Sequence, residues 1–235
     1  TAMLPAFVRH PNITITAGAD LDTEVLSKFT MDFQCESYSS VEAMCSSPQV
    51  DIVYIATPNH FHTEHAVAAL ENGKHVLLEK PMALTLDEAD TIIEAADRNK
   101  VALAVNVKHS FEPRIQRINA FVRSGELGNL RMIHNWYYND WIYRPRTEEE
   151  LNPKLGGGVV WRQGPHQIDI FRTIGGGMVR SVRATVGTWD TERPVPGCYV
   201  AYLEFESGVV AVGVYDGYDH FHSTELVHQN HEIKR

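Results

Sequence analysis

Three short apolar runs, each followed by a segment with helical periodicity, constrain the fold of this chain more than any other feature. They cover residues 50–56, 75–78 and 101–107. Strands that are apolar along most of their length are typical of parallel sheets, which helices cover on both faces. Because strands and helices alternate as far as residue 127, we expect a doubly wound parallel sheet of the α/β class in this half.

Capping residues indicate where helices of this half begin. Two pairs have the spacing of capping boxes: Ser39 with Glu42, and Thr85 with Glu88. In such a pair each side chain bonds a backbone N–H group at the start of the helix. A β-branched run over residues 13–17 predicts a further strand, which leads to the acidic residue Asp20.

The pattern of the sequence changes after residue 127. Extended segments are predicted at residues 130–138 and 179–187, with a hairpin formed by residues 199–206 and 209–215. One good helix, residues 163–173, interrupts these strands. We therefore expect a first domain over residues 1–127 and an α+β domain over residues 128–235 with a mainly antiparallel, open sheet.

Composition argues against several classes of partner. A formal net charge of -9 and a pI near 5.7 do not fit a nucleic-acid-binding surface or attraction to an anionic membrane. No apolar run is long enough to span a bilayer, and the first ten residues lack the features of a signal peptide. Three cysteines without metal-like spacing fit a reducing compartment, so we expect a cytoplasmic location.

Two motifs follow neighbouring strands of the predicted parallel sheet. One is residues 56–62 (ATPNHFH), and the other is Glu79-Lys80-Pro81. Ligands of open α/β sheets bind beyond the carboxyl ends of the strands, where both motifs are expected. Either motif alone could be a simple turn, but the two together at adjacent strand ends favour a binding site.

The sequence resembles the glucose–fructose oxidoreductase and inositol dehydrogenase family (Gfo/Idh/MocA) over most of its length. The resemblance rests on Ala19-Asp20, TPNHFH, the stretch over residues 62–90 (HTEHAVAALENGKHVLLEKPMALTLDEAD), and a triple glycine that leads to residues 164–169 (GPHQID). It implies a dehydrogenase with a Rossmann-type domain that binds a nicotinamide cofactor.

The resemblance also implies roles for particular residues. Lys80 and His166 would be the catalytic residues, with Lys80 beside the nicotinamide and His166 facing the substrate. Pro81 would follow a cis peptide bond. The cofactor-binding residues would be Asp20, Thr57, Pro58, Asn59, His62, Glu79 and Lys80. A lysine in that position could accept a hydroxyl proton as hydride leaves the substrate.

The family pattern further predicts elements outside this sequence. A strand and a Gly-x-Gly-x-x-Gly turn would precede a helix like residues 1–9. We therefore expect the parallel sheet to lack its first strand, and the second domain to be incomplete at its C-terminal end.

Asp20 bears on the choice of cofactor. An acidic side chain at the end of the second strand can accept hydrogen bonds from a ribose 2′-hydroxyl, and it would repel a 2′-phosphate. This favours NAD over NADP. The alternative role for Asp20 is a helix cap.

Arginine gives the first indication of the substrate. Arg162 stands four residues before His166, where the family usually has an aspartate. Its guanidinium offers a fixed fork of donors that suits a carboxylate or phosphate, and further basic groups are expected nearby, so a small anionic substrate is predicted. The other expected substrate-binding residues are Arg144, Arg146, His109 and Asp169. Arg144 and Arg146 could instead lie on a solvated loop.

Three hypotheses for the function remain open. Within the family, residues 140–172 most resemble enzymes that oxidise the cis-4,5-dihydrodiol of phthalate, whose two carboxylates arginine could bind. The resulting ketone would tautomerise to a catechol. The second hypothesis is a sugar or inositol dehydrogenase. The third is a non-catalytic NAD sensor that binds a protein partner, against which Lys80 and His166 argue.

The histidines raise the question of a metal site. Two groups of histidines occur close together in sequence: His60, His62 and His65, and then His220, His222, His228 and His231. Neither has the spacing of a known metal site, so no metal is expected.

Alternation over residues 199–215 predicts an apolar sheet face that packs on a second copy in a homo-oligomer, although a helix of the same chain could cover it equally well.

Overall fold

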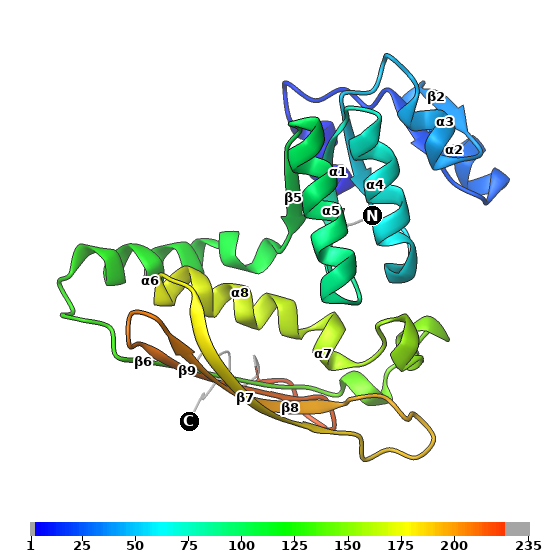
Figure 1. Ribbon diagram of the computed structural model, residues 1–235. Coiled ribbons are helices and arrows are strands. Elements are labelled where there is room, and N and C mark those ends of the chain that lie inside the picture. The colour runs from blue at the N-terminus through cyan, green and yellow to red at the C-terminus, as the bar shows by residue number, and fades with distance from the viewer. Residues whose placement is uncertain (1–2, 224–235) are drawn as a thin grey trace, which may run out of the picture. The chain divides into compact units, whose positions relative to one another are not determined.

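The computed structural model describes residues 3–223, and it divides into two compact units, residues 1–106 and 107–235 (Figure 1). The division falls between Asn106 and Val107, whereas the sequence placed the joint near residue 127. The difference is helix α6 (Pro113–Ser124), which contacts helix α8 (Gly164–Gly175) of the second unit. A helix that follows a strand can pack against the domain before it or the domain after it, and the sequence pattern does not distinguish these two arrangements.

The first unit contains two parallel pieces of sheet. Strands β1 (Ala17–Ala19) and β2 (Glu36–Tyr38) form one, and strands β3 (Ile52–Ile55), β4 (His75–Glu79) and β5 (Leu103–Asn106) form the other, in that order. Its helices are α1 (Leu4–Arg9), α2 (Thr23–Phe33), α3 (Val41–Cys45), α4 (His62–Glu71) and α5 (Leu86–Asn99), with a 3-10 turn η1 (Asn59–Phe61). The expected parallel α/β class is confirmed.

Helices α4 and α5 lie side by side (Figure 1) and bury the core of this unit. Leu70 and Leu78 are completely buried, as is Ile92. Burying a leucine or isoleucine side chain contributes roughly 1.5–3 kcal/mol. The strand ends on which the two motifs lie are therefore held by a well-packed core.

Two local predictions for this unit need correction and one is confirmed. Helix α3 is capped by Ser40, whose hydroxyl accepts from Ala43 N, and not by Ser39. The strand expected at residues 13–17 forms instead at Ala17–Ala19, where a partner strand is available. The capping box of Thr85 is present as predicted at the start of α5.

The second unit is a four-stranded sheet with helices on one face (Figure 1). Its strands are β6 (Met132–Tyr138), β7 (Val179–Gly187), β8 (Cys198–Phe205) and β9 (Val210–Asp216), in the order β6-β9-β8-β7. The pairs β7–β8 and β8–β9 are antiparallel, as predicted, including the hairpin at Ser207-Gly208. The pair β6–β9 is parallel, which the sequence did not predict.

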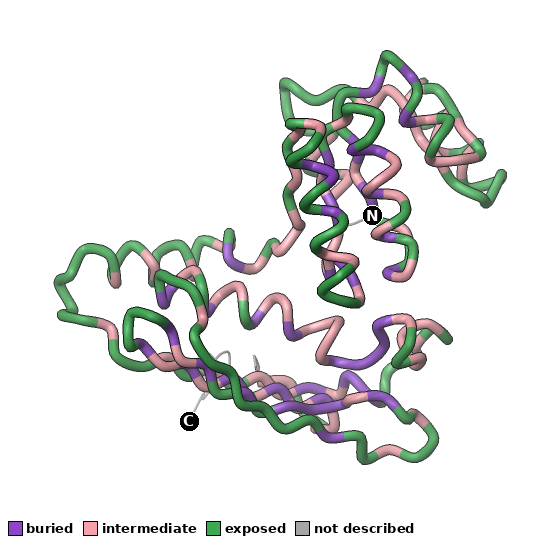
Figure 2. Tube along the Cα trace, in the orientation of Figure 1, coloured by how far each residue is buried: buried purple, intermediate pink, exposed green. Residues whose placement is uncertain are grey.

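Helix α8 packs on the inner face of this sheet through Gln167 and Phe171, both of which are buried. The close approach requires Gly213 on β9, because a Cβ atom there would lie 2.5 Å from Gln167 Oε1. Within the second unit, buried positions recur along β8 and β9, as Figure 2 shows. The helix that carries His166 is thus fixed to a rigid support.

The outer face of the sheet carries apolar side chains in register. Trp136, Val214 and Val200 face one another across three neighbouring strands, and Val212 and Tyr202 form part of the next row. Trp136 is 61% exposed and Val200 is 50% exposed. In residues 3–223 no helix has both the length and the apolar character needed to cross a membrane.

Candidate functional site

The first group of candidate residues lies at the carboxyl ends of β3 and β4. Thr57, Pro58 and Asn59 follow β3, and Glu79 ends β4. The peptide bond between Lys80 and Pro81 is cis, as the resemblance predicted. The structure therefore brings the two sequence motifs to the same edge of one parallel sheet.

His62 links the two motifs. Its Nδ1 lies 2.7 Å from the carbonyl oxygen of Pro81, and its Nε2 lies 3.0 Å from that of Thr57. The side chain is 1% exposed, and this burial lowers the pKa of His62 although the two carbonyl contacts oppose the shift. His62 thus holds the loop after β3 against the loop after β4, a role that the sequence did not predict.

Glu79 is held across all three strands of this sheet. Its Oε1 accepts from the hydroxyl of Tyr54 at 2.6 Å and from Nδ2 of Asn106 at 2.7 Å. Tyr54 lies on β3 and Asn106 on β5, so the carboxylate joins both neighbours of β4. Sequence reasoning missed these two residues because cross-strand contacts depend on register, which the motifs do not encode.

Asn59 is the residue in this group that most clearly fits a bound ligand. It is 8% exposed, and its Nδ2 has no hydrogen-bond partner among residues 3–223. Buried amide groups are nearly always hydrogen-bonded, so a donor left over at a strand end indicates an acceptor that the described part of the chain does not supply.

Asp20 follows the carboxyl end of β1 and is exposed. Its Oδ1 accepts from Asp22 N at 2.9 Å, while Asp22 is the residue that caps helix α2 through the N–H groups of Glu24 and Val25. The alternative role of Asp20 as a helix cap is therefore taken by Asp22.

The second group of candidate residues belongs to the second unit, where a glycine loop leads into two helices. Gly157 and Gly158 precede α7 (Val159–Arg162), which carries Arg162, and α8 carries His166. A Cβ at Gly157 would lie 2.6 Å from the carbonyl oxygen of Glu150, and Gly158 has a φ of +89°. The triple glycine thus has a packing reason, and it fixes the start of α7.

His109 and His166 are in contact. Their ring centroids are 4.2 Å apart and their planes are inclined by 77°. His109 lies on the 3-10 turn η2 (Lys108–Phe111), which packs on α8. Asp169 lies three residues beyond His166, on the same side of the helix. The structure thus brings two of the predicted residues, His109 and His166, into contact, and Asp169 lies three residues further along the same helix.

Arg144 and Arg146 are engaged with their own loop. Arg146 donates to the carbonyl oxygen of Trp141 through Nε and Nη2, donates to Glu150 through Nη1, and lies 4.1 Å from the Trp141 ring centroid. Arg144 is paired with Asp140, whose pKa it lowers chiefly by hydrogen bonding. These contacts favour a structural role for Arg146 in particular.

Two histidines of the second sequence group, His220 and His222, lie within the described residues. His220 stacks on Tyr143, and His222 Nε2 lies 2.9 Å from the Tyr137 hydroxyl. His228 and His231 lie outside the described residues. Over residues 3–223, no three histidine, cysteine or acidic side chains are grouped so that they could hold a metal ion.

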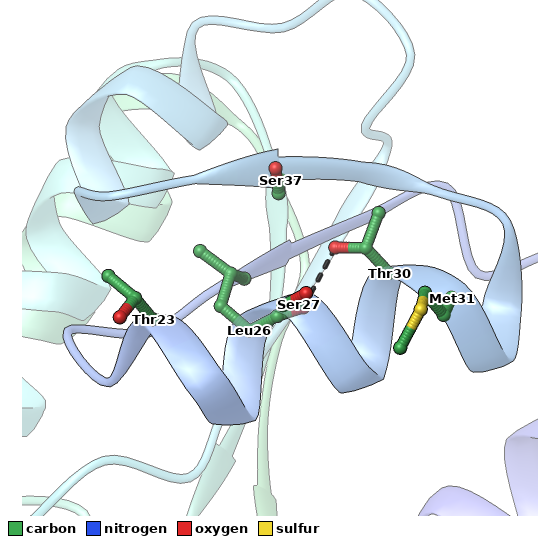
Figure 3. A pocket seen from close by; sticks show the side chains of 6 residues that line it. All are labelled: Thr23, Leu26, Ser27, Thr30, Met31 and Ser37. Carbon is green, nitrogen blue, oxygen red and sulfur yellow. Dashed lines mark hydrogen bonds between the residues drawn. The ribbon is translucent and has the colours of Figure 1, made fainter.

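A shallow hollow of about 270 Å³ lies beside helix α2 (Figure 3). Hydroxyl and apolar side chains line it: Thr23, Leu26, Ser27, Thr30, Met31 and Ser37. The Thr30 hydroxyl donates to the Leu26 carbonyl oxygen at 2.8 Å. The hollow contains none of the candidate residues named above, and its lining shows no group that would select a ligand.

Comparison with known proteins agrees with both units. Residues 1–107 match the oxidoreductase family, NAD-binding Rossmann fold, and residues 115–228 match the GFO/IDH/MocA C-terminal domain. The sequence is 42% identical over 226 residues to 1-carboxy-3-chloro-3,4-dihydroxycyclo hexa-1,5-diene dehydrogenase of Comamonas testosteroni. That alignment covers 96% of this chain and 57% of the relative.

Two solved structures are also similar. A dehydrogenase structure from Bordetella bronchiseptica RB50 superposes with a TM-score of 0.91 at 42% identity, covering 95% of this chain and 59% of that one. Levoglucosan dehydrogenase, in complex with NADH and levoglucosan, superposes with a TM-score of 0.82 at 25% identity. The match covers 93% of this chain and 62% of that one. The chain thus spans a little over half the length of these relatives, and it belongs to the Gfo/Idh/MocA oxidoreductase family.

Proposed function

We propose that the protein is an NAD-dependent dehydrogenase that oxidises a ring CH–OH group of a carboxylated cis-dihydrodiol, such as the 4,5-dihydrodiol of phthalate. The observation that carries the proposal is the relative from Comamonas testosteroni, whose name describes a carboxylated dihydroxycyclohexadiene as substrate. The arginine that replaces the usual aspartate before His166 points to the same substrate chemistry.

The first unit would hold the cofactor. The buried Nδ2 of Asn59 supplies a donor for it, and Thr57, Pro58 and Glu79 surround the same strand ends. Asp20, exposed after β1, would accept hydrogen bonds from the ribose hydroxyls, which favours NAD over NADP. When bound, NAD would take the hydride that leaves the substrate carbon.

The second unit would bind the substrate. Arg162 would hold a carboxylate, and His166, His109 and Asp169 would orient the diol. Arg146 already donates to Trp141 and Glu150, so a contribution from it, or from Arg144, would require those contacts to be exchanged. The proposal depends on Arg162 because it stands four residues before His166, where the family usually has an aspartate.

The reaction balances without any further reactant. The C–H bond of the alcohol carbon breaks and its electron pair leaves as hydride, while the hydroxyl proton passes to Lys80 Nζ. A carbonyl group results. Transfer of a ring proton to solvent and protonation of the carbonyl oxygen then give the catechol, and the gain of aromaticity draws the reaction forward.

Formation of NADH by the protein expressed from its complete gene tests this proposal. The carboxylated dihydrodiol should be oxidised with a kcat/KM at least tenfold above those for inositol and levoglucosan. Arg162→Gln should lose about 10- to 100-fold in kcat/KM, as removal of a hydrogen bond to a charged group predicts. Arg172→Gln, an exposed arginine on α8, is the matched control. Oxidation of neutral polyols alone would overturn the proposal.

Sugar or polyol oxidation is the second candidate. The structural similarity to levoglucosan dehydrogenase favours it, because that protein was solved with a neutral sugar derivative and NADH. The two candidates share Lys80 and His166 and differ in the role of Arg162. The kinetic comparison above therefore separates them.

We further propose that the outer face of the second sheet contacts a second copy of the chain. Support comes from the two apolar rows of that face, in which Trp136, Val214 and Val200 lie side by side. A cytoplasmic location is also proposed. It is supported by the three free cysteines, two of them buried.

A further inference from the structure

Three ionisable side chains of the second unit form a continuous line of contacts. Glu112 Oε1 lies 2.5 Å from His109 Nδ1, and the ring of His109 lies 4.2 Å from that of His166, inclined by 77°. Neither the motifs nor the comparisons assign a role to Glu112. His109 and Glu112 are each about one-third exposed, so the pair is neither fully buried nor freely solvated.

Both oxygens of the Glu112 carboxylate are used. Oε1 faces His109, and Oε2 pairs with Arg114 at 2.7 Å. Glu112 is also the N-cap residue of α6, yet its side chain makes no hydrogen bond to the start of that helix. Its carboxylate is therefore directed to the histidine and the arginine, away from the ordinary capping role of an acidic residue at a helix start.

The backbone around this pair is anchored. Ser110 is 5% exposed, and its hydroxyl donates to the Val107 carbonyl oxygen at 3.1 Å. Gln116 Nε2 donates to the Ser110 carbonyl oxygen at 2.7 Å, which ties η2 to helix α6. His109 is thus carried on a fixed segment, with its ring held from one side by Glu112.

The carboxylate determines which nitrogen of His109 carries a proton. An ionised carboxylate only accepts hydrogen bonds, so Nδ1 must be the protonated nitrogen. In the neutral ring Nε2 is then the acceptor, and rotation of the ring by a half turn would break the contact with Glu112. A ring fixed in this way also limits the rotation of His166, which it touches edge to face.

We infer that Glu112 is a positioning residue, which fixes the tautomer and orientation of His109 and, through it, the imidazole of His166. The inference rests on the proposed function for the role of His166 in orienting a substrate. It adds a carboxylate from the start of α6 to a group whose other members come from η2 and α8. Arg114 holds the second oxygen of that carboxylate and so restricts its rotation.

Nitrogen-15 NMR of the histidine side chains in the full-length protein tests the inference without reference to activity. At a pH where His109 is neutral, the wild-type protein should show a protonated Nδ1 and an unprotonated Nε2. Glu112→Met removes the acceptor at similar volume and should shift His109 towards the opposite tautomer, with a change in the His166 signals as well. Glu112→Gln keeps an acceptor oxygen and should restore most of the wild-type pattern.

Kinetics give the second readout. Glu112→Met should lower kcat for oxidation of the diol about tenfold and change KM by no more than about twofold. A tenfold loss is at the lower end of the range expected when a group that orients a functional histidine is removed. Glu112→Gln should recover part of that loss. Glu126→Met, a change of an exposed glutamate in the same unit, is the matched control and should alter neither readout.

The two proposals fail in different ways. An unchanged His109 tautomer in Glu112→Met overturns the positioning role, whatever the enzyme oxidises. A changed tautomer with undiminished kcat in a protein that oxidises the diol overturns it as well. If the wild-type protein oxidises no diol while the tautomer changes as expected, the proposed function fails and the link between Glu112 and His109 stands.

Discussion

The Tyr199 hydroxyl donates a hydrogen bond to Gln167 Oε1 over 2.9 Å, in the buried layer between helix α8 and the sheet of the second unit. On its other side, Gln167 Nε2 donates to Asn135 Oδ1 at 2.5 Å. Gln167 thus connects β8 to β6 through the helix that carries His166. A buried amide that satisfies partners on two strands fixes both the position and the rotation of that helix.

Replacing Gln167 with leucine should destabilise the protein by about 2–4 kcal/mol. The change leaves the Tyr199 hydroxyl and the Asn135 amide without this partner, and each buried unsatisfied group costs about 1–3 kcal/mol. Denaturant unfolding measures the loss. Ile168→Ala, at a 40% exposed position on the same helix, should cost under about 1 kcal/mol.

A double-mutant cycle with Tyr199→Phe sharpens this prediction. Because the two residues share one hydrogen bond, their combined effect should fall short of the sum by about 1 kcal/mol. Strict additivity would show that Gln167 acts on stability independently of Tyr199.

His62 should make the stability of the protein sensitive to acid. Its pKa in the folded state lies below the ordinary value of 6.5, chiefly because of burial, so folding favours the neutral ring. The stability that this contributes is fully present above the unfolded pKa and is lost as the pH falls through the folded one. The free energy of unfolding, measured at about pH 8 and about pH 5, should therefore drop more for the wild type than for His62→Gln.

An equal drop for the two proteins would contradict that account of His62. The same variant should also weaken NAD binding measured by calorimetry at neutral pH, because it loosens the link between Thr57 and Pro81. His75→Gln provides a control, since His75 lies at the opposite end of β4.

Cys45 should contribute to a loss of stability at alkaline pH. Burial, reinforced by the charge of Glu42, raises the pKa of this thiol from 9.0 to about 11. The stability gained from the protonated thiol is complete below pH 9.0 and is lost as the pH rises towards about 11, by up to roughly 3 kcal/mol. Unfolding measured across that range should show a shallower decline for Cys45→Ala.

Cys35→Ala is the control for the alkaline measurement, because Cys35 is only partly buried. It should retain most of the wild-type decline. If both variants decline as steeply as the wild type, Cys45 is not the responsible group and the buried tyrosines of the second unit become the candidates.

Trp136 should determine self-association if the outer sheet face is an interface. Trp136→Lys places a charge within the apolar row formed with Val214 and Val200, and it should lower the molar mass measured by light scattering. Val182→Lys is the control, because Val182 is 60% exposed on the same sheet but on the opposite face. An unchanged mass for Trp136→Lys would exclude this face as the contact.

The sequence predicted those parts of the fold that depend on local pattern. Continuous apolar runs located β3 and β4, and the capping box located the start of α5. It missed β2, whose residues Glu36–Tyr38 contain no apolar run and pair with β1 in the folded structure. It also missed the parallel pairing of β6 with β9, because contacts between distant strands are set by topology.

In the candidate site, too, the sequence predicted the residues that follow a local pattern and missed those that depend on tertiary contacts. The rule that ligands bind at strand ends led to Thr57, Asn59 and Lys80. Residues that support those positions escaped notice, since Tyr54 and Asn106 reach Glu79 only across the sheet. Glu112 was missed for a related reason: it belongs to neither sequence motif, and only the folded structure shows its carboxylate at His109.

The central claim, that Arg162 binds a carboxylate of a dihydrodiol substrate, is tested most directly by comparing the acid with its methyl ester. For the wild-type protein, kcat/KM for NADH formation should fall about 10- to 100-fold from the acid to the ester, the loss expected when a hydrogen bond to a charged group is removed. For Arg162→Gln the acid and the ester should be oxidised equally slowly. Oxidation of both compounds at the wild-type rate by Arg162→Gln would contradict the account.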